Sequence, residues 1–172
     1  MQQIREVEQS LPFALLAFDV DNGSEFLNHH LWRYFTQRRP PVGLTRSRPY
    51  KKNDQAHVEQ KNWTHVRQLL GYQRIEDRSV IPLLNDLYGS WALLHNYFCP
   101  TLMLLRKTRI GSKTRRTYSP PQTPYHRLLD CSALQTEQKE RRQTTYAQLN
   151  PVELKKIIET KLKRVFDHLR IR

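Results

Sequence analysis

The hydrophobic pattern begins with a nearly continuous apolar run at residues 11–20, which ends at Val20. A run of this kind predicts a strand buried on both faces, with neighbouring strands on each side. The polar segment before it, residues 2–10, predicts a short helix. Little else precedes the strand to cover it, so we expect the chain to be the later part of a truncated domain.

Helical spacing of apolar residues then predicts amphipathic helices over residues 25–37 and 53–70, the second ending near Gly71. Within the second helix, positions 59, 63, 66 and 70 form one stripe. This stripe places Glu59 at the edge of the core rather than in solvent. Asn62, three residues further on, shares that face.

The pattern changes again after a helix predicted at residues 81–98. A Gly111-Ser112 turn between basic, β-prone residues predicts a basic hairpin. Residues 132–148 are polar, and we expect them to be weakly ordered. A last amphipathic, basic helix is expected after Asn150, which is followed by Pro151 at the first helical position.

The net charge changes this picture most. The 172 residues include 29 Lys and Arg but only 16 Asp and Glu, which gives a net charge of +13. Such an excess favours a polyanionic partner, and nucleic acid is the first candidate. No segment approaches the roughly 20 apolar residues that cross a membrane, and the N-terminus has no signal peptide. Cys99 and Cys131 have no zinc or disulfide spacing, which favours a reducing cytoplasm.

One basic stretch, residues 31–52, contains no acid at all and is interrupted by prolines. We expect it to form a short strand and a flexible loop. Such a loop can be simply a solvated face, but the lack of acids favours a role in following phosphates. Its cations are Arg33, Arg38, Arg39, Arg46, Arg48, Lys51 and Lys52.

Two carboxylates lie at positions that suit a metal site. Asp21 directly follows the predicted strand, and Glu59 lies on a helix. Phosphoryl transfer on DNA uses Mg²⁺ or Mn²⁺ held by oxygen ligands. Each acid alone has an ordinary explanation, since Asp-Asn-Gly is a common turn sequence and helix acids are usually solvated. Asp19, on the same side of the strand as Asp21, is an alternative ligand or a cap of the strand end.

The combination of two runs carries a resemblance to a known family. The first is Asp21-Asn22-Gly23-Ser24-Glu25-Phe26, and the second extends from Ser47 through Asn53-Asp54-Gln55-Ala56-His57-Val58-Glu59-Gln60-Lys61-Asn62. Together they closely resemble the catalytic core of DDE transposases and retroviral-type integrases, particularly bacterial insertion-sequence transposases. The resemblance is most specific over residues 13–70 and extends over about residues 1–129.

That resemblance implies an α/β, ribonuclease H-like fold and an Asp-Asp-Glu triad that binds two Mg²⁺ ions. Asp21 would be the second aspartate and Glu59 the glutamate. Asn62 would help to position DNA, together with Lys52, Gln55 and Lys61. The first aspartate of the triad and the first three strands have no counterpart in this chain.

We therefore expect the C-terminal half of a ribonuclease H-like integrase core at residues 1–98. A small basic β segment at 99–128, and a polar linker with a helical tail at 129–172, would follow it. The family's reaction is DNA strand cleavage and transfer, and this chain alone is expected to be inactive. The alternatives are a catalytically dead DNA-binding protein, or a second polypeptide that supplies the missing aspartate. A bacterial, nucleoid-associated homo-oligomer is the expected setting.

Overall fold

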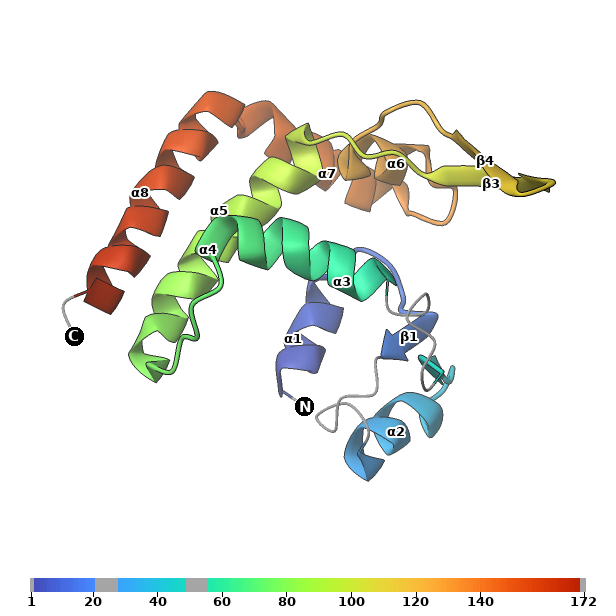
Figure 1. The fold of residues 1–172 in the computed structure, drawn as a ribbon, viewed down its shortest axis with the longest axis horizontal. Helices are drawn as coiled ribbons and strands as arrows, with labels where there is room; N and C mark the ends of the chain where they lie inside the picture. Colours follow the sequence, from blue (N-terminus) through green and yellow to red (C-terminus); the bar gives the residue numbers. More distant parts are fainter. Residues whose placement is uncertain (1, 21–27, 49–55, 171–172) are drawn as a thin grey trace. The chain divides into compact units, whose positions relative to one another are not determined.

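The computed structural model describes residues 2–20, 28–48 and 56–170, which form helices and two small sheets (Figure 1). The protein is mixed α/β in this coarse sense, as expected. Residues group into two compact units, Met1–Arg74 and Ile75–Arg172. The elements of unit 1 are α1 (Gln2–Ser10), β1 (Ala17–Val20), α2 (His29–Thr36), β2 (Gly43–Arg46), α3 (Ala56–Asn62), the π-helical η2 (Trp63–Arg67) and α4 (Gln68–Leu70). Those of unit 2 are the 3-10 helix η3 (Arg78–Val80), α5 (Ile81–Phe98), β3 (Leu104–Ile110), β4 (Lys113–Tyr118), α6 (Pro124–Asp130), α7 (Thr136–Gln148) and α8 (Pro151–Arg170).

The sheet of unit 1 is a parallel pair in which Ala17 lies opposite Gly43 and Val20 opposite Arg46. Backbone bonds extend the pairing at both ends, from Gly43 N–H to the Leu16 carbonyl (3.0 Å) and from Ser47 N–H to the Val20 carbonyl (2.9 Å). The expected buried strand over residues 11–20 was wrong in two respects. Only its last four residues form a strand, and that strand has one neighbour among the described residues. Without cover, Leu16 remains 82% exposed.

The core beside this sheet is built from α2 and from Val42, the residue before β2. Leu31, Phe35 and Val42 are almost fully buried. Phe18 of β1 stacks on Phe35 with ring centroids 4.8 Å apart, and burying one such aromatic side chain contributes about 1.5–3 kcal/mol. Partly buried Leu44 packs against the same cluster. Apolar spacing within α2, Leu31 to Phe35, is therefore what joins the helix to the strands.

Glu8 connects α1 to α2 through two polar contacts. Its carboxylate pairs with the Arg38 guanidinium at 2.5 Å and accepts a hydrogen bond from the Tyr34 hydroxyl at 2.7 Å. The hydrogen bond from Arg38, followed by that from Tyr34, holds the pKa of Glu8 below its usual value. Arg38 also lies over the Tyr34 ring, 5.3 Å from its centroid. The Glu8 carboxylate, through its contacts with Arg38 and Tyr34, therefore joins the two helices.

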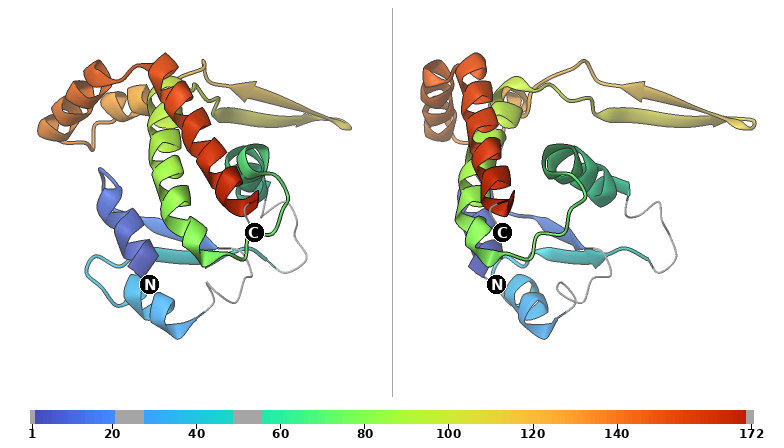
Figure 2. Two further views of the ribbon diagram at one scale, coloured as in Figure 1. Left: turned by 90° about the vertical axis from the view of Figure 1, so that its left-hand side faces the viewer. Right: turned by 60° about the vertical axis from the view of Figure 1, so that its left-hand side comes forward.

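In unit 2, α5 and α8 lie side by side (Figure 2). Leu87 and Val165 are fully buried, and Leu154 and Ile158 nearly so. This confirms the predicted apolar face of the last helix except at Ile157, which is 42% exposed. At the edge of this packing, the Lys161 ammonium donates to Asp86 Oδ1 (2.6 Å) and to Ser90 Oγ (2.8 Å).

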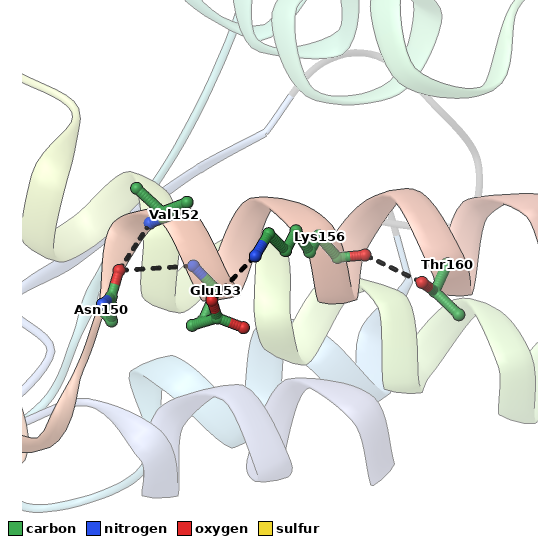
Figure 3. Close-up of polar contacts among 5 residues, drawn as sticks. All are labelled: Asn150, Val152, Glu153, Lys156 and Thr160. Atoms are coloured by element: carbon green, nitrogen blue, oxygen red, sulfur yellow. Dashed lines mark hydrogen bonds and ion pairs between the residues drawn. The ribbon is translucent and has the colours of Figure 1, made fainter.

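The start of α8 follows the cap that was predicted from Asn150 (Figure 3). Asn150 Oδ1 accepts hydrogen bonds from the backbone N–H groups of Val152 (2.9 Å) and Glu153 (3.4 Å). Glu153 in turn pairs with Lys156, one turn further along (3.0 Å). Local sequence is thus sufficient to set where this helix begins.

The weakly ordered segment expected at residues 132–148 is wrong over most of its length, because Thr136–Gln148 forms α7. The ring of Tyr146 explains the difference. It stacks on Tyr125 of α6 (4.7 Å between centroids) and on Tyr97 of α5 (6.2 Å). Packing on two other helices stabilises a polar helix that propensity alone would leave marginal.

No helix within the described residues is long and apolar enough to cross a membrane.

We predict that Glu8→Gln lowers the free energy of unfolding by about 1–2 kcal/mol near neutral pH, because a charge-assisted pair is lost. The native pKa of Glu8 lies below the ordinary value of 4.5. Its contribution is therefore complete above that pH and disappears as the pH falls through the native pKa. Urea unfolding should show a smaller difference at pH 3 than at pH 7. Glu137→Gln, which removes an exposed pair with Arg141, should change little at either pH.

Tyr146→Ala should cost about 0.5–3 kcal/mol and reduce helix content, because α7 loses its aromatic anchor. Far-UV circular dichroism during thermal unfolding measures both effects. Tyr118→Ala is the control, since Tyr118 is an exposed residue of β4. Equal effects of the two substitutions would show that the Tyr146 cluster does not hold α7.

Candidate functional site

The candidate site begins where β1 ends. In parallel sheets, ligands bind at the carboxyl ends of the strands. Val20 is the last residue of β1, and Ser47 directly follows β2. Asp21 follows Val20 in sequence, but it lies outside the described residues, as do Lys52 and Gln55. Their predicted roles as metal ligand and DNA contacts stay predictions.

Asp19 occupies the middle of the strand pair, opposite Thr45. Its Oδ1 atom accepts a hydrogen bond from Thr45 Oγ1 at 2.6 Å. Cross-strand pairs of this kind stabilise a sheet. Of the two readings of Asp19, metal ligand or strand cap, this contact supports a structural role at the strand.

Glu59 lies in α3 and is exposed, so its predicted place at the edge of the core is wrong. Trp63, one turn further on, is 49% exposed, and Val66 is 36% exposed. The π-helical η2 begins at Trp63, and its i→i+5 bonding adds a residue to the turn and rotates the side chains that follow it, Leu70 included, relative to Glu59. The regular stripe drawn from Glu59 to Leu70 therefore does not form.

Asn62 and Lys61 are exposed on the same short helix. Asn62 is three residues from Glu59, so the two share one side of α3, as predicted. Lys61 is two residues from Glu59 and leaves the helix on a different side. The helix can thus present a carboxylate and an amide together to one ligand, with Lys61 available to a neighbouring phosphate.

The donor chemistry of Asp21 and Glu59 suits Mg²⁺, which prefers hard carboxylate oxygens. In the part of the chain that the structure describes, however, no group of three or more His, Cys, Asp or Glu side chains could hold a metal ion. The structure thus leaves Glu59 as the one described member of the predicted pair. Asp21, the other member of the pair, lies outside the described residues.

Sequence reasoning predicted the β3–β4 hairpin correctly but assigned no binding residues to it. All its cations are exposed. They are Arg106, Lys107, Arg109, Lys113, Arg115 and Arg116. The signal that could have identified them is the absence of any acid between Asp86 and Asp130.

Comparison with known proteins gives one informative relative. The chain is 40% identical over 124 residues to an uncharacterized protein of Sinorhizobium fredii, y4rM. The match covers 72% of this chain but only 35% of that protein, so the chain spans about a third of its relative's length. No family model matches the chain. No solved structure matches it either.

Removing the cross-strand contact should test the structural role of Asp19. We expect Thr45→Val and Asp19→Ala each to destabilise unit 1, with a coupling energy of about 0.5–1.5 kcal/mol in a double-mutant cycle measured by urea unfolding. The double variant should then cost less than the sum of the single ones. Strict additivity would show that the two side chains do not stabilise each other.

Proposed function

We propose that this chain is part of a DNA-processing protein of the DDE transposase and integrase type, whose reaction is metal-dependent strand cleavage and transfer. One observation carries the proposal. The parallel pairing of β1 with β2 ends at Val20, and Asp21 follows it at the carboxyl end of the strand. That is where an α/β sheet presents residues to a ligand.

Each residue has a defined part in this proposal. Asp21 and Glu59 would hold Mg²⁺, which when bound supplies a Lewis acid for phosphoryl transfer. Asn62, on the same side of α3 as Glu59, would orient the DNA strand. Lys52, Gln55 and Lys61 would contact the backbone. The basic stretch of residues 31–52 would follow neighbouring phosphates.

Two carboxylates are an incomplete set for the chemistry of this family, since the resemblance requires a further aspartate that these 172 residues do not supply. Loss of one ligand that positions the ions should reduce the reaction by orders of magnitude. We therefore propose that the chain alone binds DNA but cleaves it poorly. A second polypeptide carrying the missing carboxylate would restore activity on mixing.

The second candidate function is DNA binding without catalysis. The observation that favours it is the exposed, acid-free cationic hairpin together with a net charge of +13. A bacterial, nucleoid-associated setting and a homo-oligomeric state would suit either function. Both functions share the partner and differ only in the use of the metal.

Metal binding distinguishes the two. We predict that the wild-type chain binds Mn²⁺, measured by electron paramagnetic resonance as loss of the free-ion signal, and that Asp21→Asn with Glu59→Gln abolishes this. Glu159→Gln with Asp167→Asn, at two exposed acids of α8, is the charge-matched control and should retain binding. DNA affinity in fluorescence anisotropy should be unchanged or slightly higher in the double variant, since two negative charges are lost.

Equal Mn²⁺ binding by wild type and the double variant would contradict the transposase-type site and leave the second candidate. Nicking of supercoiled plasmid with Mg²⁺ is the parallel assay. We expect it to be weak with the wild-type chain and absent with the double variant.

A further inference from the structure

The β3–β4 hairpin is an exposed two-stranded arm (Figure 1). Thirteen residues form its two strands, and all of them except Thr108 are exposed. The turn depends on Gly111, whose φ of +61° is unfavourable for other residues. Arg109 Nε closes the turn by donating to the Gly111 carbonyl at 3.1 Å.

The base of the arm is anchored to the rest of unit 2. Met103 N–H donates to Ser119 Oγ (3.0 Å), and Ser119 N–H donates to the Met103 carbonyl (2.8 Å). Thr101 pairs with Gln122, and the Arg127 guanidinium of α6 donates to the Thr101 hydroxyl and carbonyl. These contacts join the residues that flank the two strands to each other and to α6.

Cations occupy both faces of the arm. Residues directly opposite in an antiparallel pair share a face. One face therefore carries Lys107 opposite Arg116 and Arg109 opposite Thr114. The other face carries Arg106 opposite Thr117, Arg115 opposite Thr108, and Lys113 opposite Ile110. Each face thus has three positive charges.

This arrangement is unfavourable for the isolated arm. Lys107 and Arg116 are direct cross-strand neighbours, and like charges in that position destabilise a sheet. The arm contains no acid, and none of the ion pairs found among the described residues uses one of its cations. An anionic partner would remove this repulsion, so the charges point to binding rather than to stability.

The composition of the arm selects among anionic partners. Single-stranded nucleic acid is held by stacking of bases on aromatic rings, but Tyr118 is the only aromatic residue in 104–118. The major groove of B-form DNA admits a two-stranded ribbon. The corresponding groove of duplex RNA is too narrow and deep for side chains to read. Cations on both faces match a groove that is flanked by phosphates on two sides.

We propose that the β3–β4 arm binds double-stranded DNA by entering the major groove, with each cationic face directed at one of the two flanking phosphate backbones. This inference depends on the DNA partner of the proposed function, but not on the carboxylates Asp21 and Glu59. Its contribution is electrostatic, so it supplies affinity and position rather than base recognition.

Salt dependence of binding by the full chain tests this. Two variants each neutralise one face: Lys107→Gln, Arg109→Gln and Arg116→Gln in one, and Arg106→Gln, Lys113→Gln and Arg115→Gln in the other. The control neutralises three exposed cations of α8, by Lys155→Gln, Lys163→Gln and Arg164→Gln. Fluorescence anisotropy with a labelled duplex DNA, from 50 to 200 mM salt, gives the slope of log K against log salt.

Each arm variant should reduce the magnitude of that slope by about 2.7, since every lost phosphate contact removes about 0.9. The control should leave it unchanged. Thermal unfolding should show both arm variants close to wild type. In one, relief of the Lys107–Arg116 repulsion offsets the lost Arg109–Gly111 hydrogen bond, and in the other no packed side chain is lost. A loss of binding that follows a loss of stability would overturn the proposal.

Other outcomes also decide the matter. If the arm variants gave the same change in slope as the control, the proposed DNA contact of the arm would be wrong. A change in slope for only one of the two arm variants would also contradict it. Duplex RNA, heparin or anionic phospholipid vesicles bound as tightly as duplex DNA would overturn the choice of partner. Failure of the wild-type chain to bind DNA at all would contradict the proposed function as well, whereas binding that is independent of the arm contradicts only this inference.

Discussion

The parallel pairing of β1 with β2, held by the stack of Phe18 on Phe35, is the constraint on which unit 1 depends. It ties together two strands that are separated by a helix and a basic loop. It also sets where the chain leaves the sheet, immediately before Asp21. A parallel pair of four-residue strands is marginal alone, so burial of Leu31, Phe35 and Val42 supplies what the hydrogen bonds do not. The polar link from Glu8 to Arg38 adds α1 to the same packing.

Acidic and basic residues are distributed unequally between the two units, so the proposed metal ligands and the cationic arm lie in different units. The residues suited to a metal, Asp21 and Glu59, both lie in unit 1. The densest acid-free cluster of cations lies on β3 and β4 in unit 2. In the two proposals, the metal ligands would come from unit 1, and phosphate contacts would come from the basic stretch of unit 1 and from the arm of unit 2.

Most elements could be predicted, because their signals are local. Apolar spacing predicted α5, Gly111-Ser112 predicted the hairpin, and Asn150-Pro151 predicted the start of α8. The failures share a cause. Tyr146 packs on α5 and α6, and η2 inserts a wide turn after Glu59; neither event is visible in the hydrophobic pattern. The candidate site was predictable only as residue types, since exposure and mutual distance depend on packing.

The sequence by itself determined the helix over residues 81–98, the basic hairpin, the start of the last helix, the strong positive charge and the presence of two acids in runs that resemble a transposase core. Those properties follow from composition and short-range spacing, which need no tertiary contact to be expressed. Only the tertiary structure decided that Glu59 is exposed, that Asp19 bonds Thr45, and that the hairpin's cations occupy both faces. The Asp19–Thr45 contact and the two cationic faces depend on the register of a strand pair, whereas the exposure of Glu59 depends on what packs against α3. Register is set by contacts between residues distant in the chain or by backbone hydrogen bonding that side-chain patterns do not record.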